Sequence, residues 1–432
     1  MTNKNIYRTL LSIALIASCF TANAQYKVKQ VLVANGGSFG SPGNMITIGS
    51  FSPVTGKYTL FDSVPGNDVT QVLVDSVFAY MATDSYLVKY DLNSLVRVKI
   101  TPCKNLRYIA VYKDEIIASI GDTISPVQLK IFKKLDLSLI YTETKMSNIY
   151  CNGITVSGDS AYVALQGGYP NYNDTGRIAV EDLANQKFKR VITLDTTEKG
   201  IGDMFANGSS IVGVSEYPYS SISEINLITG AKTFILFNKG SLTSIGLPFA
   251  LINDSLYAEY QNDIINGIGA FDLNAQVANF VVKPTPNYAA AALDTVNKLF
   301  YYTGGSFTKP TKTWIYNYNN KAIDSFNVGI APEGIAIDYY KHTSGINEQN
   351  LMQANLMVYP NPSNTSLNIS GIDAKNAEIK IIDITGRVLS TSTADLNDKG
   401  ITNIPVSQLP QGIYFINIQS NEGFVSKEFV KN

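Results

Sequence analysis

Short apolar runs separated by polar turns recur along most of the chain, from about Tyr26 to Tyr340. A strand, a tight turn and a second strand repeat every 39 to 49 residues. The turns are predicted at Asp75-Ser76, Asp114-Glu115, Asp159-Ser160, Gly208-Ser209, Asp254-Ser255, Thr295-Val296 and Asp338-Tyr339. No long stretch has helical periodicity, which excludes leucine-rich and helical solenoids. A strand-only repeat of this length predicts a β-propeller with four strands in each blade.

One repeat shows how the four strands are assigned. Gln71 to Val74 is a short apolar run that suits a buried inner strand, and Val77 to Met81 follows it after a tight turn. Tyr86 to Leu92 alternates in polarity, and Val96 to Ile100 forms the outer edge. Both segments are rich in residues that favour strands, so the repeat reads as one blade.

The two ends of the repeat region complement each other. The first unit, from about Lys27 to Phe61, has a second, third and fourth strand but no inner strand. The last unit ends with an inner strand, 334–338, that has no blade of its own. Joining the two gives seven blades and removes the exposed edges of an open sheet. We therefore expect a seven-bladed β-propeller over residues 25–340, followed by a polar linker over 341–355.

The remaining segment, 356–432, predicts a separate small β-sandwich of the immunoglobulin-like type. Pro360 and Pro362 keep its first residues extended. The turn from Asp383 to Gly386 lies between two apolar runs, as in a hairpin. Apolar and polar residues alternate from Tyr414 to Gln419, as in a strand with one buried face. The whole chain is thus predicted to be all-β.

Five short blocks in this segment resemble a known export signal. They are Val358 to Pro362, Leu367 to Ile369, Asp383 to Leu389, Leu409 to Ile418 and Lys427 to Lys431. In this order they resemble the type A C-terminal sorting domain of the type IX secretion system of Bacteroidetes. The resemblance implies that the type IX machinery is a partner of the chain. The alternative is an ordinary immunoglobulin-like adhesion module.

The N-terminus predicts a secretory signal over residues 1–24. Lys4 and Arg8 precede an apolar stretch, and Ala22-Asn23-Ala24 then offers a small-residue cleavage site. An alternative is a lipoprotein signal, in which Cys19 would carry a lipid. Together with the C-terminal resemblance, this signal predicts a protein that is secreted or held on the outer cell surface.

Charge and residue counts exclude several functions. The formal net charge is −1 and only 16% of residues are charged, so no basic surface for nucleic acid is expected. The single histidine, His342, is predicted to lie in the linker, which excludes histidine-based hydrolysis and histidine-ligated metals within the propeller. No phosphate-binding loop is present, and no metal or cofactor is predicted. Cys103 and Cys151 are expected to be unpaired.

Carboxylate chemistry stays open as an alternative, so an enzyme is not excluded. Asp174, Asp203, Glu216 and Glu333 lie near predicted loops, and a lyase or glycosidase would need two such groups to converge. The oxygen-rich segment from Asn171 to Thr175 lacks the spacing of a calcium loop.

Loops between second and third strands share an unusual composition. Three of them, at Gly36 to Pro42, Gly167 to Tyr172 and Gly304 to Pro310, contain a Gly-Gly pair, an aromatic residue and a proline, and Glu216 to Tyr219 keeps the aromatic and proline. On a closed ring these loops would open on one face. The candidate ligand-binding residues are Phe39, Tyr169, Tyr172, Tyr217, Tyr219 and Phe307. Rigid aromatic faces suit a corrinoid or a glycan, whereas the alternative is that they pack on neighbouring loops.

Three short segments of the propeller region resemble a family of surface propellers. Val31 to Gly37, Val54 to Lys57 and Leu106 to Ile109 are similar to the YncE-like propellers of Bacteroidetes, which include vitamin B12-capture proteins. The resemblance implies a corrinoid ligand and adds Asn35 and Arg107 to the candidate site. Ligand capture would also suit an outer-membrane transporter as a partner. The sequence thus favours a binding protein, with a carboxylate enzyme and a structural or adhesive surface protein as alternatives.

Overall fold

The computed structural model describes most of the chain. The described residues are 25–122, 124, 127–145, 150–168, 171–172, 175–237, 244–261, 266–282, 288–342, 356–370, 374–383, 387–396, 402–420 and 423–432. They form two compact units, one of residues 27–340 and one that contains residues 341–432. Among them, no helix combines the length and the apolar character needed to cross a bilayer.

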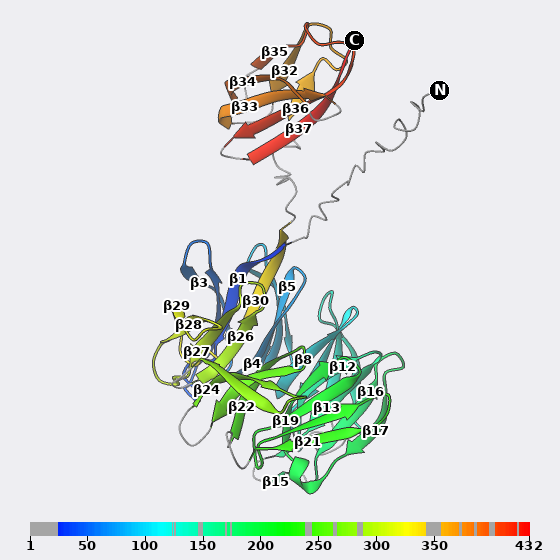
Figure 1. Cartoon of the computed structure of the whole chain (residues 1–432). Helices are drawn as coiled ribbons and strands as arrows, with labels where there is room; N and C mark the ends of the chain where they lie inside the picture. Colours follow the sequence, from blue (N-terminus) through cyan, green and yellow to red (C-terminus); the bar gives the residue numbers. More distant parts are fainter. Residues whose placement is uncertain are drawn as a thin grey trace, which may run out of the picture. The chain divides into compact units, whose positions relative to one another are not determined.

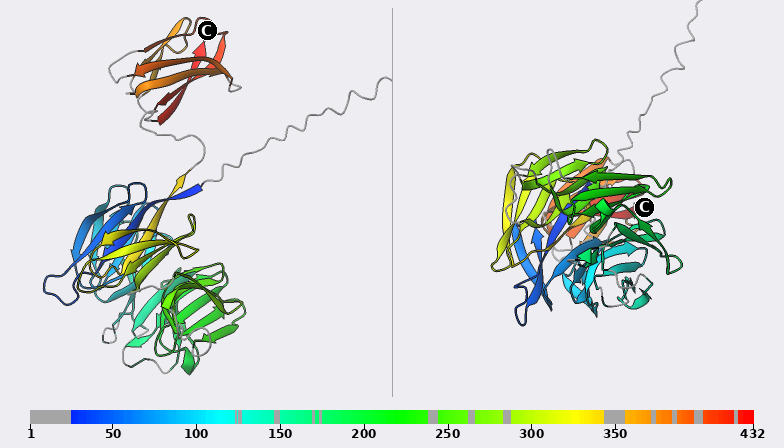
Figure 2. Two further views of the ribbon diagram at one scale, coloured as in Figure 1. Left: turned by 60° about the vertical axis from the view of Figure 1, so that its left-hand side comes forward. Right: turned by 90° about the horizontal axis from the view of Figure 1, so that it is seen from below.

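The first unit is a seven-bladed β-propeller. Seven four-stranded antiparallel sheets follow one another around a common axis (Figures 1 and 2). The first blade contains β30 (Gly334–His342), β1 (Gln25–Asn35), β2 (Met45–Ser52) and β3 (Lys57–Pro65), and the second contains β4 (Val69–Asp75), β5 (Phe78–Thr83), β6 (Tyr86–Asp91) and β7 (Val96–Pro102). The third blade contains β8 (Leu106–Tyr112), β9 (Glu115–Ile120), β10 (Leu129–Lys133) and β11 (Leu139–Glu143). The fourth contains β12 (Cys151–Ser157), β13 (Ser160–Leu165), β16 (Arg177–Asp182) and β17 (Lys187–Thr193).

The other three blades repeat the same strand order. They are β18 (Ile201–Asn207), β19 (Ser210–Ser215), β20 (Ser221–Asn226) and β21 (Lys232–Leu236); β22 (Ser244–Ile252), β23 (Ser255–Gln261), β24 (Asn266–Asp272) and β25 (Val277–Val282); and β26 (Tyr288–Asp294), β27 (Leu299–Gly304), β28 (Thr311–Asn317) and β29 (Ala322–Val328). A small hairpin of β14 (Gly167–Gly168) and β15 (Asn171–Tyr172) extends the fourth blade, and a short 3₁₀ turn, η1 (Thr196–Glu198), precedes the fifth.

The chain closes the ring by pairing β30 with β1, so the first blade contains both ends of the repeat region. β30 continues to His342, two residues into the predicted linker. The predicted turn at Asp338-Tyr339 is wrong, because both residues lie inside this strand. Asp338 is buried there and accepts a hydrogen bond of 2.8 Å from Gln30 Nε2 of β1. An Asp that looks like a turn former therefore joins the two strands.

The core consists of apolar layers between neighbouring blades. Strand β1 shows the reason, because its side chains alternate between the two faces of the sheet. Val31 and Val33 pack against the seventh blade, whereas Leu32 and Ala34 pack against the second. Similar buried clusters lie between the other neighbouring blades. Every blade is thus buried on both faces, which leaves the loops and the inner strand edges to carry function.

The second unit is a β-sandwich, as predicted. One sheet contains β31 (Met357–Tyr359), β32 (Ser366–Ser370) and β35 (Thr402–Pro405), and the other contains β33 (Ala374–Asp383), β34 (Val388–Leu396), β36 (Gly412–Ser420) and β37 (Gly423–Lys431). Apolar residues of both sheets, such as Leu367 and Ile416, form one buried core. Asn361 holds the first segment against β37, since its Oδ1 accepts a hydrogen bond of 2.8 Å from the Val430 N–H.

Candidate functional site

Six inner strands of the propeller share an irregularity near their first residues. The irregularity occurs in β4, β8, β12, β18, β22 and β26. At one point in each pairing, the inner strand has at least one more residue than the partner segment that it faces. Such β-bulges bend a strand and turn side chains away from the regular alternation. The shifts fall at Val69/Gln71, Leu106/Ile109, Cys151/Ile154, Ile201/Asp203, Gly246/Ala250 and Tyr288/Ala290.

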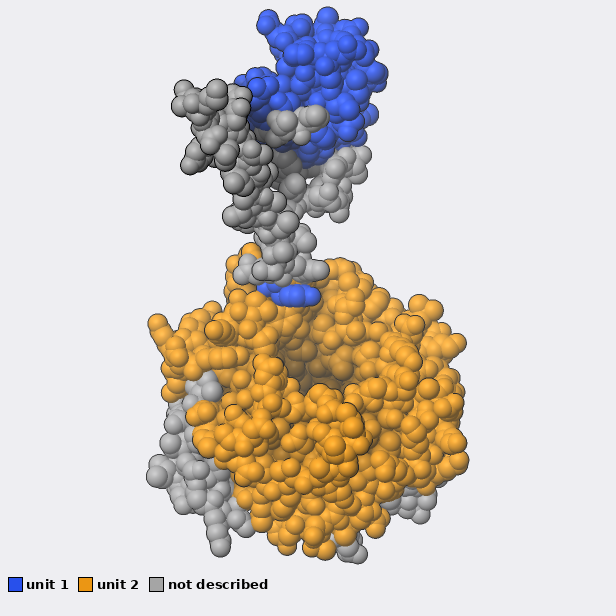
Figure 3. Space-filling model, turned by 45° about the vertical axis from the view of Figure 1, so that its right-hand side comes forward, with its two compact units in different colours: residues 1–26, 341–432 blue, residues 27–340 orange. Residues whose placement is uncertain are grey.

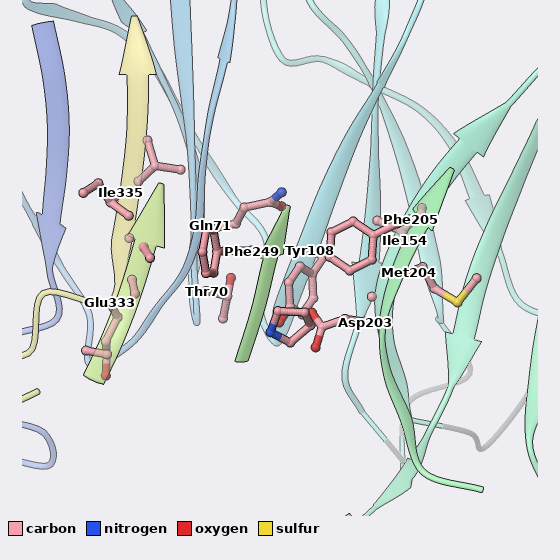
Figure 4. A pocket seen from close by; sticks show the side chains of 17 residues that line it. Thr70, Gln71, Tyr108, Ile154, Asp203, Met204, Phe205, Phe249, Glu333 and Ile335 are labelled. Carbon is pink, nitrogen blue, oxygen red and sulfur yellow. The ribbon is translucent and has the colours of Figure 1, made fainter. Parts of the chain in front are cut away.

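The bulged segments line a cavity of about 230 Å³ on the propeller axis. Its wall is formed by residues of β4, β8, β12, β18, β22, β26 and β30, among them Thr70, Tyr108, Asp203 and Phe249 (Figure 4). The space-filling view shows the propeller unit hollowed near its centre (Figure 3). In a regular ladder, each of these residues would pair with a residue of the neighbouring strand. Because Thr70, Tyr108 and Phe249 lie within the bulges, their side chains turn toward the axis.

A second cavity of about 260 Å³ continues the first toward the loops. The two share Thr70, Tyr108, Ala289 and Glu333, and the second adds Asp68, Val69, Arg107, Gly305 and Phe307. Asp68, Arg107 and Glu333 lie at or just before the first residues of inner strands, whereas Phe307 belongs to the loop between β27 and β28. The site therefore has a wall made by inner strands and a rim made by loops, and both face the same end of the ring.

Burial changes the protonation of the carboxyl groups in this wall. It raises the pKa of Asp203 to about 6, although Tyr108 and Arg107 counteract the rise. It raises the pKa of Glu333 to about 7, with the charge of Asp68 adding to the effect. Glu216, which follows β19 and is not part of the described lining, has its pKa raised to about 8 by burial and by the charges of Asp203 and Glu259. These groups thus change charge near neutral pH.

Glu333 lies in close contact with the start of β4 and with the loop after β1. Glu333 Oε2 accepts a hydrogen bond of 3.3 Å from the Val69 N–H at the start of β4. Gly36 lies directly beside this carboxylate, and a Cβ at Gly36 would overlap Oε2. The Gly36 N–H donates to the Ala331 carbonyl at 2.6 Å, which fixes the loop beside the segment that carries Glu333. The first glycine of the predicted Gly-Gly pair therefore makes room for an acidic wall residue.

The structure brings Arg107 and Phe307 together and places other candidates elsewhere. Arg107 and Phe307 both line the outer cavity, and Arg107 Nη1 lies 3.4 Å from Asp68 Oδ2. Asn35 is buried away from the cavity lining, where its Nδ2 donates to Thr47 Oγ1 at 3.1 Å and its Oδ1 accepts from the Gly329 N–H at 2.8 Å. Its amide therefore stabilises the junction of the first and last blades.

Phe39, Tyr217 and Tyr219 are loop residues that do not belong to the described cavity lining. Phe39 is 72% exposed, and Tyr217 and Tyr219 are also exposed. Lys199 Nζ lies 5.8 Å from the centre of the Tyr219 ring. Tyr169 lies outside the described residues, and only the backbone of Tyr172, in β15, is described.

Sequence reasoning missed Tyr108, Thr70 and Phe249 as wall residues and left Asp203 and Glu333 without an assigned place. Four of them belong to different inner strands, Glu333 directly precedes a fifth, and no local motif marks any of them. Among the described residues, no group of three or more His, Cys, Asp or Glu side chains is arranged to hold a metal ion. Cys103 and Cys151 are buried thiols whose pKa is raised by burial, which disfavours the reactive thiolate.

Comparisons with known proteins support the fold and the export signal. Residues 357–432 match the family model of the secretion system C-terminal sorting domain. A "putative 6-phosphogluconolactonase" from Bacteroides uniformis resembles the chain with a TM-score of 0.53 and 11% identity, covering 72% of this chain and 100% of its own. A similar protein from Bacteroides fragilis has a TM-score of 0.52 and 10% identity, covering 72% of this chain and 98% of its own. None of the curated proteins compared with the chain matches it.

These findings define a class of protein. The chain is a β-propeller that carries a C-terminal sorting domain, and it is exported through type IX secretion to the cell surface or beyond. The two solved structures are 6-phosphogluconolactonase-like propellers and do not specifically support a YncE-like or B12-capture propeller. At this level of identity the likeness extends to the fold alone.

Proposed function

We propose that this secreted propeller binds a small polar ligand in the central cavity, with the inner-strand wall as its contact surface and the Phe307 loop as its rim. The observation that carries the proposal is the ring of bulges, because six inner strands depart from regular pairing at the level of the cavity. Bulges of this kind are common next to functional sites, where they re-aim side chains.

The dimensions favour a small ligand. The two parts of the site, of about 230 and 260 Å³, are at or below the lower end of the range for small-molecule pockets. A monosaccharide or disaccharide suits this space, since hydroxyl groups can bind the carboxyl groups and Arg107 while a sugar face packs on an aromatic ring. A corrinoid with its side chains is much larger and would contact only the rim. Glycan capture is therefore the favoured version, and transfer to an outer-membrane transporter belongs to the same hypothesis.

A carboxylate enzyme is the second candidate. Asp203 and Glu333 line one cavity, and Glu333 has a pKa of about 7, which suits a general acid that is protonated near neutral pH. A glycosidase or lyase would use such a group together with a second carboxylate. The lactonase activity named for the two similar structures is not transferred to this chain, because their identity of 10% and 11% supports only the fold.

A binding screen of the full chain tests this proposal. The screen would present a glycan array, cobalamin and the same glycans as chromogenic glycosides. We expect at least one glycan to bind without being cleaved, and the substitution Arg107→Ala to weaken that binding. Cleavage of a glycoside would favour the enzyme. Absence of any ligand, or binding that Arg107→Ala leaves unchanged, would favour a structural or adhesive role.

A further inference from the structure

The central cavity is lined by more acidic than basic side chains. The inner part has Asp203 and Glu333 in its described lining and no lysine or arginine. The outer part adds one acid and one base, Asp68 and Arg107. These two lie 3.4 Å apart at Oδ2 and Nη1, so the carboxylate offsets much of the guanidinium charge. The cavity therefore has a surplus of carboxyl groups.

The two wall carboxyls lie on opposite sides of the axis. Asp203 belongs to β18 of the fifth blade, and Glu333 directly precedes β30 of the first blade. In the ring, β22 and β26 separate these strands on one side and β4, β8 and β12 on the other. Figure 4 shows Asp203 beside Tyr108 and Glu333 across the cavity from them. A group on the axis is thus flanked by both acids.

We propose that the group bound on the axis is a protonated amine, carried by a small ligand such as an amino sugar or an alkyl diamine. This inference rests on the proposed function and specifies the chemical class of its ligand. An ammonium group offers three hydrogen-bond donors and one positive charge, which two carboxyls can accept. Tyr108 and Phe249 line the same space, and aromatic faces attract cations. A carboxylate or phosphate ligand would instead meet like charges.

Binding of an amine should be linked to proton release. Among the described residues, the titratable or charged groups that line the cavity are Asp68, Arg107, Tyr108, Asp203 and Glu333, and Glu216 and Glu259 interact electrostatically with this set. Burial raises the pKa of Asp203 to about 6, of Glu333 to about 7 and of Glu216 to about 8, so part of this set is neutral at pH 6. An alkyl amine, with a pKa of about 10.4 as in lysine, stays charged throughout. Affinity should therefore rise with pH as the carboxyls ionise.

The test is calorimetric titration of the full chain with hexamethylenediamine and with hexanediol, which has hydroxyl groups in place of the amines. Titrations at pH 6 and pH 8, which lie on either side of the pKa of about 7 of Glu333, use two buffers of different ionisation enthalpy. We expect the diamine to bind more tightly than the diol, more tightly at pH 8, and with release of protons. The neutral isosteres Asp203→Asn and Glu333→Gln should each weaken diamine binding roughly tenfold or more. Asp136→Asn removes an exposed carboxylate from the third blade and serves as the matched control.

Each outcome decides the inference. Diamine binding with the expected pH dependence and loss in both wall variants supports it. Equal affinity for diamine and diol, or binding that is independent of both wall acids, overturns it. If a neutral glycan binds in the screen while the diamine does not, the inference fails and the proposed function stands. If neither binds, both fail. The wild-type pH profile needs no variant and stays decisive if a substitution prevents folding.

Discussion

The rim and the wall of the central cavity are built from different kinds of segment. The rim consists of the loop that contains Phe307, whose side chain is 58% exposed. The wall consists of inner-strand residues such as Tyr108 and Asp203, which bulges direct toward the axis. A rigid wall can hold a ligand group in a fixed geometry, whereas an exposed loop adds contact area at the entrance. Under the proposed function, the wall determines the chemistry of the ligand and the rim modulates access.

The largest effect should come from a change in the loop after β1, which contacts the wall residue Glu333. Gly36→Ala would place a Cβ against the Glu333 carboxylate, which must then shift. We expect ligand binding to fall at least roughly tenfold, whereas the free energy of unfolding should fall by less than about 1 kcal/mol, because the overlapped atom is the far end of a flexible side chain. Calorimetry and urea unfolding measure the two effects. Ser41→Ala, at an exposed position in the same loop, should change neither. Normal binding by Gly36→Ala would show that Glu333 is not a wall contact.

Two phenylalanines in corresponding loops distinguish the contribution of the rim to binding from that of exposed aromatic residues in general. Phe307 lines the outer cavity, whereas Phe39 occupies the corresponding loop of the first blade but not the lining. Phe307→Ala should weaken binding roughly threefold to tenfold, equivalent to the loss of one partly exposed aromatic contact. Phe39→Ala should bind like wild type. Because both rings are exposed, unfolding free energies should stay within about 0.5 kcal/mol of wild type. Equal losses from the two variants would assign binding to the whole aromatic face.

The smallest effect concerns the stability of the ligand-free chain. Glu333 has its pKa raised to about 7, so its protonated form is favoured in the folded state. Its contribution to stability is fully present below the unfolded pKa of about 4.3 and is lost as pH rises through about 7. Thermal unfolding at pH 5 and pH 8 should show that Glu333→Gln loses less stability than wild type over this interval. An identical loss in both proteins would mean that Glu333 is not responsible.

The sequence contains enough local information for the fold but not for the wall. Turn spacing predicted seven blades, and the contiguous blocks around Asn361 and Gly412 predicted the sorting domain, because each signal is confined to neighbouring residues. Asp338 misled the prediction, since an Asp in a strand and an Asp in a turn look alike without the partner Gln30. Arg107 and Phe307 were proposed from short motifs and loop composition, and both line the outer cavity. Tyr108 and Asp203 could not be assigned to the wall, because their place depends on bulges created by pairing with other strands.

The central claim is that a ligand contacts the bulged inner strands. Hydrogen–deuterium exchange of the full chain, with and without the tightest ligand from the binding screen, tests this claim most directly. We predict slower exchange of amides at the starts of β4, β8 and β18, around Thr70, Tyr108 and Asp203, with a smaller change in the Phe307 loop. Protection confined to the aromatic loops or to outer strands such as β7, with unchanged exchange at the inner strands, would contradict the claim.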